Sequence, residues 1–326
     1  MEDITFLKAQ LNQQLFMISQ SNEKVMEAAW QRWDSIGKPL RSLGALERAV
    51  VKMAGMENTV NVKMDKRAIV VLCGDHGVVK EGVTQTDSSV TKIVADNIAS
   101  GKASINIMAG KAGADVFPVD VGMMGEHYPN KEFQPMVMCD RKVAQGTGDI
   151  AVEPAMTQEQ CLRAILAGIE VVADLSTQGY EMIGMGEMGI GNTTPSSALV
   201  SVLLNLPAEE VTGRGAGLSD ASYNKKVAVI EQAVKRYWKA TEDSEIPDGP
   251  FFKIDAAVEL MSHLGGYEIA AMAGMCLGGA VFGVPIVLDG YISVAGALCA
   301  SLINADCTGI PSGPLTFQRN RRMEKY

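Results

Sequence analysis

One stretch near the middle of the chain joins a single carboxylate to glycines and hydroxyl side chains. Residues 182–197 place Glu187 among Gly184, Gly186, Gly189 and Gly191, and Asn192, Thr193 and further hydroxyls follow. Glycines let backbone amides approach a ligand closely, and the start of a helix attracts anions. The stretch therefore predicts a strand end, an anion-binding loop and a helix start with an acid beside them. A tight structural turn is the alternative.

A second glycine-rich loop lies further along the chain. It reads Gly213-Arg-Gly-Ala-Gly217, and Lys226 follows in a predicted helix. Three glycines in five residues cost backbone entropy, which makes sense where the backbone must approach a ligand. With a lysine nearby, Gly215 and Lys226 predict a phosphate site. The alternative is a plain turn whose lysines are solvated.

Acidic side chains also follow two apolar runs that are typical of buried parallel strands. Residues 68–73 lead into Gly74-Asp-His-Gly77, and residues 285–288 lead into Asp289-Gly290. Ligands of open parallel sheets bind at the carboxyl ends of the strands. This favours a functional role for Asp75. For His76, a functional role and simple packing stay equally open.

The bulk properties exclude several classes of protein. The chain has 326 residues and a net charge of -9, so no basic face for nucleic acid or a membrane surface is expected. Six scattered cysteines and an N-terminus without signal-peptide features predict a cytoplasmic protein with reduced thiols. The three histidines are widely separated, so we predict no metal site, and no cofactor is expected.

Strand-like and helical segments alternate along most of the chain. This alternation predicts an α/β fold with a parallel sheet and right-handed crossovers. A helix is expected to begin near Thr157, with Gln160 completing a capping box. Residues 1–62 show helical spacing and are expected to form part of a small domain, ahead of a large α/β domain over residues 63–326.

Taken together, these segments resemble the nicotinate-nucleotide–dimethylbenzimidazole phosphoribosyltransferase family over roughly residues 35–300. The matching pieces are residues 40–47, 74–77, 143–151, 154–156, 184–194, 213–218, 265–267 and 288–291. Their order and number are far more specific than one glycine loop. The resemblance implies a doubly wound, Rossmann-like parallel sheet with a small helical domain, and usually a dimer with sites near the subunit boundary.

The resemblance also implies a reaction. Nicotinate mononucleotide gives its 5-phosphoribosyl group to an aromatic base of the cobamide lower ligand, and C1′ inverts to an α-ribotide. Glu187 would supply the negative charge near the ribosyl cation. The residues expected to bind substrate are Asp75, Thr86, Gly189, Gly191, Asn192, Thr193, Gly215, Lys226, Asp289 and Ser293.

Two departures from the family pattern change the expectation. A Leu-Gly-Glu-Gly-type segment, whose glutamate the family uses as a general base, has no match in residues 307–326. Thr86 and Val94 stand where the family usually has a serine and a glutamine in the base-binding segment. The first departure predicts that the chain alone turns over poorly. The second suits a less polar base such as a phenol.

Three hypotheses follow from these patterns. The first is a phosphoribosyltransferase that works as one subunit of a hetero-oligomer with a homologous chain. The second is a catalytically impaired nucleotide-binding or structural partner subunit. A dinucleotide-binding oxidoreductase is the third and least favoured, because no Gly-x-Gly-x-x-Gly follows the first strand.

Overall fold

A five-stranded parallel sheet forms the centre of the molecule. The structure is a computed structural model that describes residues 3–126, 128, 130–242 and 252–307. The strands are β1 (Arg67–Gly74), β2 (Ala114–Gly122), β3 (Cys139–Asp140), β4 (Met182–Met188) and β5 (Ile286–Leu288). They lie in the order β3-β2-β1-β4-β5, and each pairs with its neighbour in parallel. The predicted apolar run over residues 68–73 is the central strand β1, as its pattern requires.

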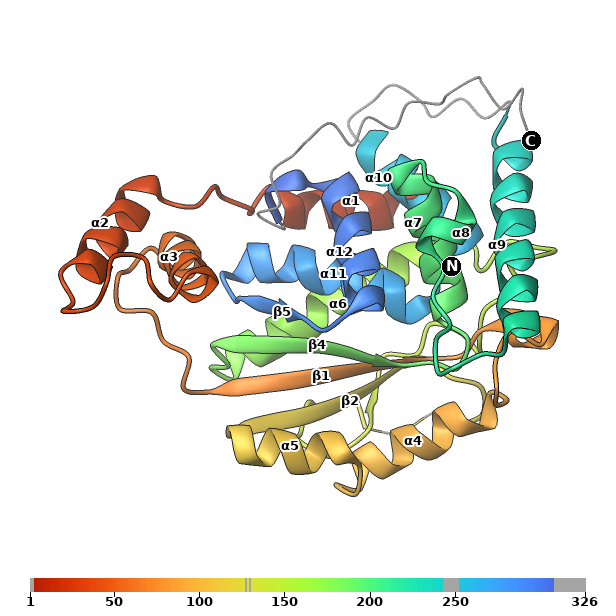
Figure 1. The fold of residues 1–326 in the computed structure, drawn as a ribbon, viewed down its shortest axis with the longest axis horizontal. Helices are drawn as coiled ribbons and strands as arrows, with labels where there is room; N and C mark the ends of the chain where they lie inside the picture. Colours follow the sequence, from red (N-terminus) through yellow and green to blue (C-terminus); the bar gives the residue numbers. More distant parts are fainter. Residues whose placement is uncertain (1–2, 127, 129, 243–251, 308–326) are drawn as a thin grey trace.

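Helices cover both faces of this sheet (Figure 1). On one face lie α4 (Ser89–Ala99) and α5 (Ser104–Ala112), which contact β1 and β2. The other face carries α6 (Gln158–Thr177), α11 (Tyr267–Phe282) and α12 (Tyr291–Ile303). The expected α/β fold with a doubly wound parallel sheet is therefore confirmed.

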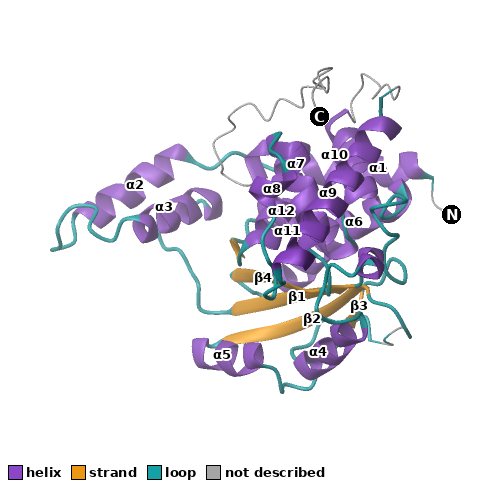
Figure 2. Ribbon diagram, turned by 45° about the vertical axis from the view of Figure 1, so that its right-hand side comes forward, coloured by secondary structure: helices purple, strands orange, loops and turns teal. Residues whose placement is uncertain are grey.

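A second layer of helices packs outside α11 and α12, away from the sheet (Figure 2). It contains α7 (Thr193–Leu204), α8 (Ala208–Val211), α9 (Asp220–Ala240) and α10 (Phe252–Leu264). Two short 3-10 helices complete the described elements, η1 (Gly77–Glu81) after β1 and η2 (Ala305–Cys307) after α12. The sequence patterns predicted neither α8 nor η1, since both are too short to show a helical period.

The N-terminal helices divide between the body and a projecting arm. Leu7 and Leu11 of α1 (Ile4–Leu15) belong to the main hydrophobic core. Helices α2 (Glu23–Asp34) and α3 (Ala45–Glu57) instead pack on each other around Ala29, Val51 and Ala54, and project from the body (Figure 1). The division into domains 1–62 and 63–326 stays a prediction.

The predicted start of α6 is confirmed atom by atom. The Thr157 hydroxyl accepts the Gln160 amide at 3.1 Å, and the Gln160 side chain accepts the Thr157 amide at 2.9 Å. This reciprocal pairing satisfies two amides that a helix start leaves open. It anchors the helix that packs most extensively against α11.

Three properties of the described residues concern their cysteines, membrane-spanning helices and metal-binding clusters. All six cysteines are free thiols. Within the described ranges, no helix has the length and apolar character needed to cross a membrane. No cluster of three or more His, Cys, Asp or Glu side chains there is arranged to hold a metal ion. The expectation about a missing general-base segment concerns residues 307–326, of which residues 308–326 lie outside the described residues.

The crossing of α6 and α11 depends on glycines. A Cβ on Gly274 would lie 1.9 Å from the Ile165 carbonyl oxygen, and a Cβ on Gly168 would lie 1.9 Å from the Ala271 carbonyl oxygen. Because both obstacles are backbone atoms in helices, neither can move aside without separating the helices. The crossing therefore holds the whole layer close to the sheet.

We expect Gly274→Ala to lower the free energy of unfolding by at least about 2 kcal/mol, since the added methyl group overpacks a backbone contact. Urea unfolding followed by circular dichroism measures this change. Gly110→Ala is the matched control: Gly110 lies in α5, with nothing within 4 Å of an added Cβ. That variant should gain about 0.5–1 kcal/mol from helix propensity. Equal effects of the two substitutions would contradict the packing argument.

Candidate active site

Glu187 lies at the carboxyl end of β4, next to the central strand. It pairs in register with Leu72 of β1 and is the last residue but one of β4. The Asn192 side-chain amide donates a hydrogen bond to Glu187 Oε2. Asn192 is the N-cap residue of α7, so the start of this helix holds the carboxylate in place.

The surroundings of Glu187 raise its pKa to about 7. Burial is the largest cause, and the negative charges of Glu268 and Asp289 act in the same direction. The hydrogen bond from Asn192 and the charge of His76 lower the pKa and only partly offset these effects. A carboxyl group with this pKa is present in both protonation states near neutral pH, which suits proton transfer.

Two of the predicted glycines are required by close approach. A Cβ on Gly189 would lie 2.5 Å from the Gly74 carbonyl oxygen at the end of β1. Gly191 has a φ of +94°, and its Cβ would lie 2.9 Å from Val79 Cγ2. The turn after β4 therefore lies against the end of β1: a side chain at Gly189 would displace backbone, and the positive φ of Gly191 favours glycine.

Lys226, Thr193 and Gly215 come together beside the start of α7. Lys226 is 1% exposed, and its Nζ donates to Thr193 Oγ1 at 2.6 Å and to the Gly213 carbonyl oxygen at 3.4 Å. A Cβ on Gly215 would lie 3.5 Å from Thr193 Oγ1 and 3.7 Å from Lys226 Nζ. Burial lowers the pKa of Lys226 to about 8. An amine buried next to a helix start and a glycine loop is suited to an anion.

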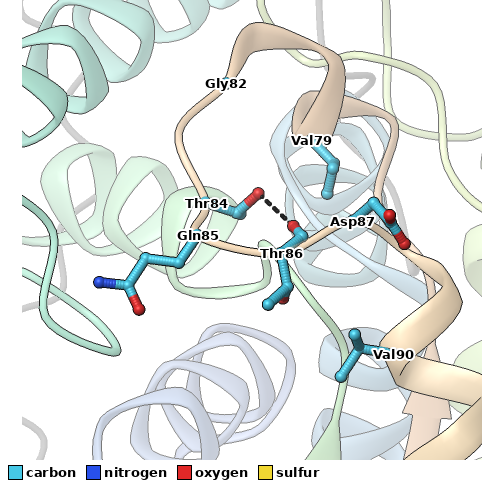
Figure 3. Close-up of a pocket in the computed structure, with 7 residues that line it drawn as sticks. All are labelled: Val79, Gly82, Thr84, Gln85, Thr86, Asp87 and Val90. Atoms are coloured by element: carbon cyan, nitrogen blue, oxygen red, sulfur yellow. Dashed lines mark hydrogen bonds between the residues drawn. The ribbon is translucent and has the colours of Figure 1, made fainter.

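A pocket of about 490 Å³ lies between η1 and the start of α4 (Figure 3). Its lining residues are Val79, Gly82, Thr84, Gln85, Thr86, Asp87 and Val90. The Gln85 side-chain amide donates to the Gly217 carbonyl oxygen at 2.7 Å, which ties the pocket to the second glycine loop. Val79 and Thr84 also lie beside Gly191. The pocket is therefore continuous with both glycine loops.

The two departures in the predicted base-binding segment lie in different places. Thr86 lines the pocket, and its carbonyl oxygen accepts the Thr84 hydroxyl at 2.8 Å (Figure 3). Val94 is one turn of α4 beyond Val90 and packs against the apolar cluster that includes Val71. Val94 is not among the residues that line this pocket.

Asp75 and His76 are both buried at the end of β1. Asp75 Oδ2 accepts the Met124 amide at 2.7 Å and so fixes the loop after β2. His76 Nε2 lies 2.6 Å from Glu268 Oε1, with both side chains inaccessible to solvent. The sequence patterns missed Glu268. Its signal was a lone acid inside a helix of small apolar residues.

Asp289 and Ser293 lie where β5 leads into α12. Asp289 is exposed, and its charge raises the pKa of Glu187. Ser293 is buried, and its hydroxyl donates to the Gly290 carbonyl oxygen at 3.0 Å. The structure thus brings Glu187, Asn192, Thr193, Gly215 and Lys226 into one continuous group. Substrate contacts of the ten predicted binding residues stay predictions.

Comparisons with known proteins agree on one family. A family model described as Phosphoribosyltransferase matches residues 18–310. A nicotinate-nucleotide–dimethylbenzimidazole phosphoribosyltransferase of Desulfotalea psychrophila is 39% identical over 293 residues, which cover 90% of this chain and 78% of that protein. A protein of the same name from Chlorobaculum tepidum is 40% identical over 276 residues, covering 84% of this chain and 72% of that protein.

A solved structure adds the fold to this agreement. The crystal structure of CobT from Thermus thermophilus matches with a TM-score of 0.77 and 36% identity, covering 87% of this chain and 80% of that chain. The similarity in sequence and the similarity in fold each extend over most of the chain. The chain therefore belongs to the nicotinate-nucleotide–dimethylbenzimidazole phosphoribosyltransferase family.

Proposed function

We propose that the chain transfers the 5-phosphoribosyl group of nicotinate mononucleotide to an aromatic base, as a step in building the lower ligand of a cobamide. The observation that carries the proposal is the continuous group that runs from Glu187 through Asn192 and Thr193 to Lys226. It brings a carboxylate with a raised pKa and a buried amine to the start of the same helix, α7. In a ribose phosphate, the ribose can meet the carboxylate and the phosphate can meet the amine.

The amine end binds the phosphate in this proposal. Lys226 Nζ lies against Thr193 Oγ1, beside Gly215 and the start of α7. A phosphate there receives a cation, a hydroxyl and the positive end of a helix dipole. Burial of the amine excludes water and strengthens the attraction. The phosphate in turn compensates a charge that the free protein holds at a cost.

The carboxylate end acts at C1′. The bond from C1′ to the nicotinate nitrogen breaks, nicotinate leaves with the electron pair of that bond, and the base forms a new bond to C1′ from the opposite face. Glu187 stabilises the positive charge that develops on the ribosyl group, through electrostatic attraction. Its pKa of about 7 also allows it to take the proton that the base loses.

The acceptor base belongs in the pocket beside Gly191. Its walls combine valine side chains with the hydroxyl groups of Thr84 and Thr86. Val94, one turn of α4 beyond the lining residue Val90, stands where the family resemblance places an amide side chain, and a valine there has no polar group to reach a ring nitrogen of benzimidazole. We therefore propose a phenol as a substrate alongside benzimidazole, and a homologous chain as the partner subunit.

We expect Glu187→Gln to lower kcat about 10²–10³-fold while the KM for nicotinate mononucleotide changes little, because the lost attraction acts on the transition state. In the unchanged protein, kcat should rise with pH through about 7, as Glu187 loses its proton. The variant should lack that rise. Release of nicotinate, separated by liquid chromatography, measures both. Glu170→Gln, on the surface-exposed side of α6, is the control. Undiminished turnover by Glu187→Gln contradicts the role of Glu187.

For Lys226 we expect a pH dependence opposite to that of Glu187. Its pKa of about 8 means that the amine is charged below pH 8 and neutral above it. We expect kcat/KM for nicotinate mononucleotide to fall as pH rises through about 8. Lys226→Arg should extend activity to higher pH, since arginine stays charged. Lys226→Met should raise KM about 30–100-fold, the loss of a charge-assisted hydrogen bond. An unchanged KM in Lys226→Met would show that the phosphate does not bind at Lys226.

The base and the partner are tested by competition. Benzimidazole and phenol are supplied together, and the ribotides are identified by mass spectrometry, with the chain alone and with a homologous subunit added. We expect phenol to be used at least as well as benzimidazole, and turnover to rise when the subunit is added. A preference for benzimidazole above about tenfold would exclude the phenol. Full turnover by the chain alone would exclude the need for a partner.

A further inference from the structure

A buried ion pair lies directly beneath the candidate active site. His76, after β1, and Glu268, in the first turn of α11, approach to 2.6 Å between Nε2 and Oε1. The side chains are 1% and 0% exposed. Glu268 Oε2 is buried and has no hydrogen-bond partner among the described residues. Such a pair is costly to bury and gives little net stability, so its position calls for an explanation.

Glycines enclose the pair so tightly that its position is set by backbone. A Cβ on Gly266 would lie 2.4 Å from His76 Cε1, and a Cβ on Gly74 would lie 2.9 Å from Glu268 Oε2. A Cβ on Gly189 would lie 3.3 Å from His76 Nε2 and 3.3 Å from the amide nitrogen of Asn192. An added Cβ at Gly189 would therefore contact both the His76 ring and the side-chain amide of Asn192 that holds Glu187.

The side chains of the ion pair are buried, so little water screens the interactions of their charges with neighbouring groups. Burial alone would lower the pKa of His76, but the charge and hydrogen bond of Glu268 outweigh it, and His76 stays protonated more readily than usual. Two further charges act here: Asp75, at the end of β1, raises the pKa of His76, and Asp289, after β5, raises the pKa of Glu187. The buried Cys73 thiol of β1 lies near enough for Glu187 and Glu268 to raise its pKa. Within the ion pair itself, the charge of Glu268 has a larger effect on the pKa of Glu187 than the charge of His76 does.

We propose that Glu268, acting through His76, is a positioning residue for the catalytic carboxylate: the buried pair supports the turn from Gly189 to Gly191 from beneath and sets the charge around Glu187. The steps run from Glu268 to His76, across Gly189 to Asn192, and from Asn192 to Glu187. The proposal rests on the proposed function for its catalytic part. Its electrostatic part concerns Glu187 in the free protein.

Glu268→Gln tests the proposal because it keeps the shape and removes the charge. Titration of Glu187 is followed by ¹³C NMR of labelled glutamate carboxyls, assigned with Glu187→Gln. We expect the midpoint, about pH 7 in the unchanged protein, to move to lower pH. The ratio of kcat at pH 6 to kcat at pH 8 should rise at least about threefold. The maximal kcat should fall about tenfold with an unchanged KM, because the Lys226 corner is separate.

Asp255→Asn is the control, since it removes another ion pair, from Lys8 at 2.5 Å, between α10 and α1. It should leave the Glu187 midpoint in place. A midpoint that Glu268→Gln leaves unchanged or raises would overturn the proposal. Should that variant not fold, ¹⁵N NMR of the unchanged protein decides: His76 must lose its ring proton at a higher pH than an ordinary histidine, about 6.5, and a midpoint at or below that value overturns the proposal. If the Glu187 midpoint shifts as expected but the unchanged protein releases no nicotinate, the proposed function is rejected instead.

Discussion

The site depends on how closely the ends of two neighbouring strands approach. The turn after β4 lies so near the end of β1 that a side chain at Gly189 would strike the Gly74 carbonyl oxygen. This contact brings the start of α7 against Glu187 and leaves His76 beneath it. Parallel sheets place ligands at this edge. Here the glycines remove the bulk that would otherwise keep the strand ends apart.

Burial then changes the acid–base properties of the side chains in the site. One carboxyl group, Glu187, and one amine, Lys226, are both shifted by burial toward neutral pH. In water, neither would change its charge in that range. The same low exposure strengthens every attraction that a bound ribose phosphate would make. A substrate that supplies the opposite charge would offset part of the free energy that burying each charged group costs.

The sequence was sufficient for the layers, but less so for the polar contacts. The apolar run of residues 68–73 and the capping box of Thr157 predicted their elements well, because both are local patterns. Glu187 and Lys226 were predicted as site residues from the glycines near them, and the structure brings them to the same helix start. Glu268 was missed, because its partner His76 is 192 positions away and no local pattern links them. The sequence alone left packing and function equally open for His76. The two could be compared only once its contact with Glu268 was known.

The central claim is that a ribose phosphate lies with its phosphate at Lys226 and its C1′ beside Glu187. A crystal structure of the chain soaked with nicotinate mononucleotide tests it most directly. We expect phosphate density within hydrogen-bond distance of Lys226 Nζ and Thr193 Oγ1, with the anomeric carbon facing Glu187 and the pocket at Thr86. Nucleotide bound elsewhere, or these loops left empty at a saturating concentration, would contradict it.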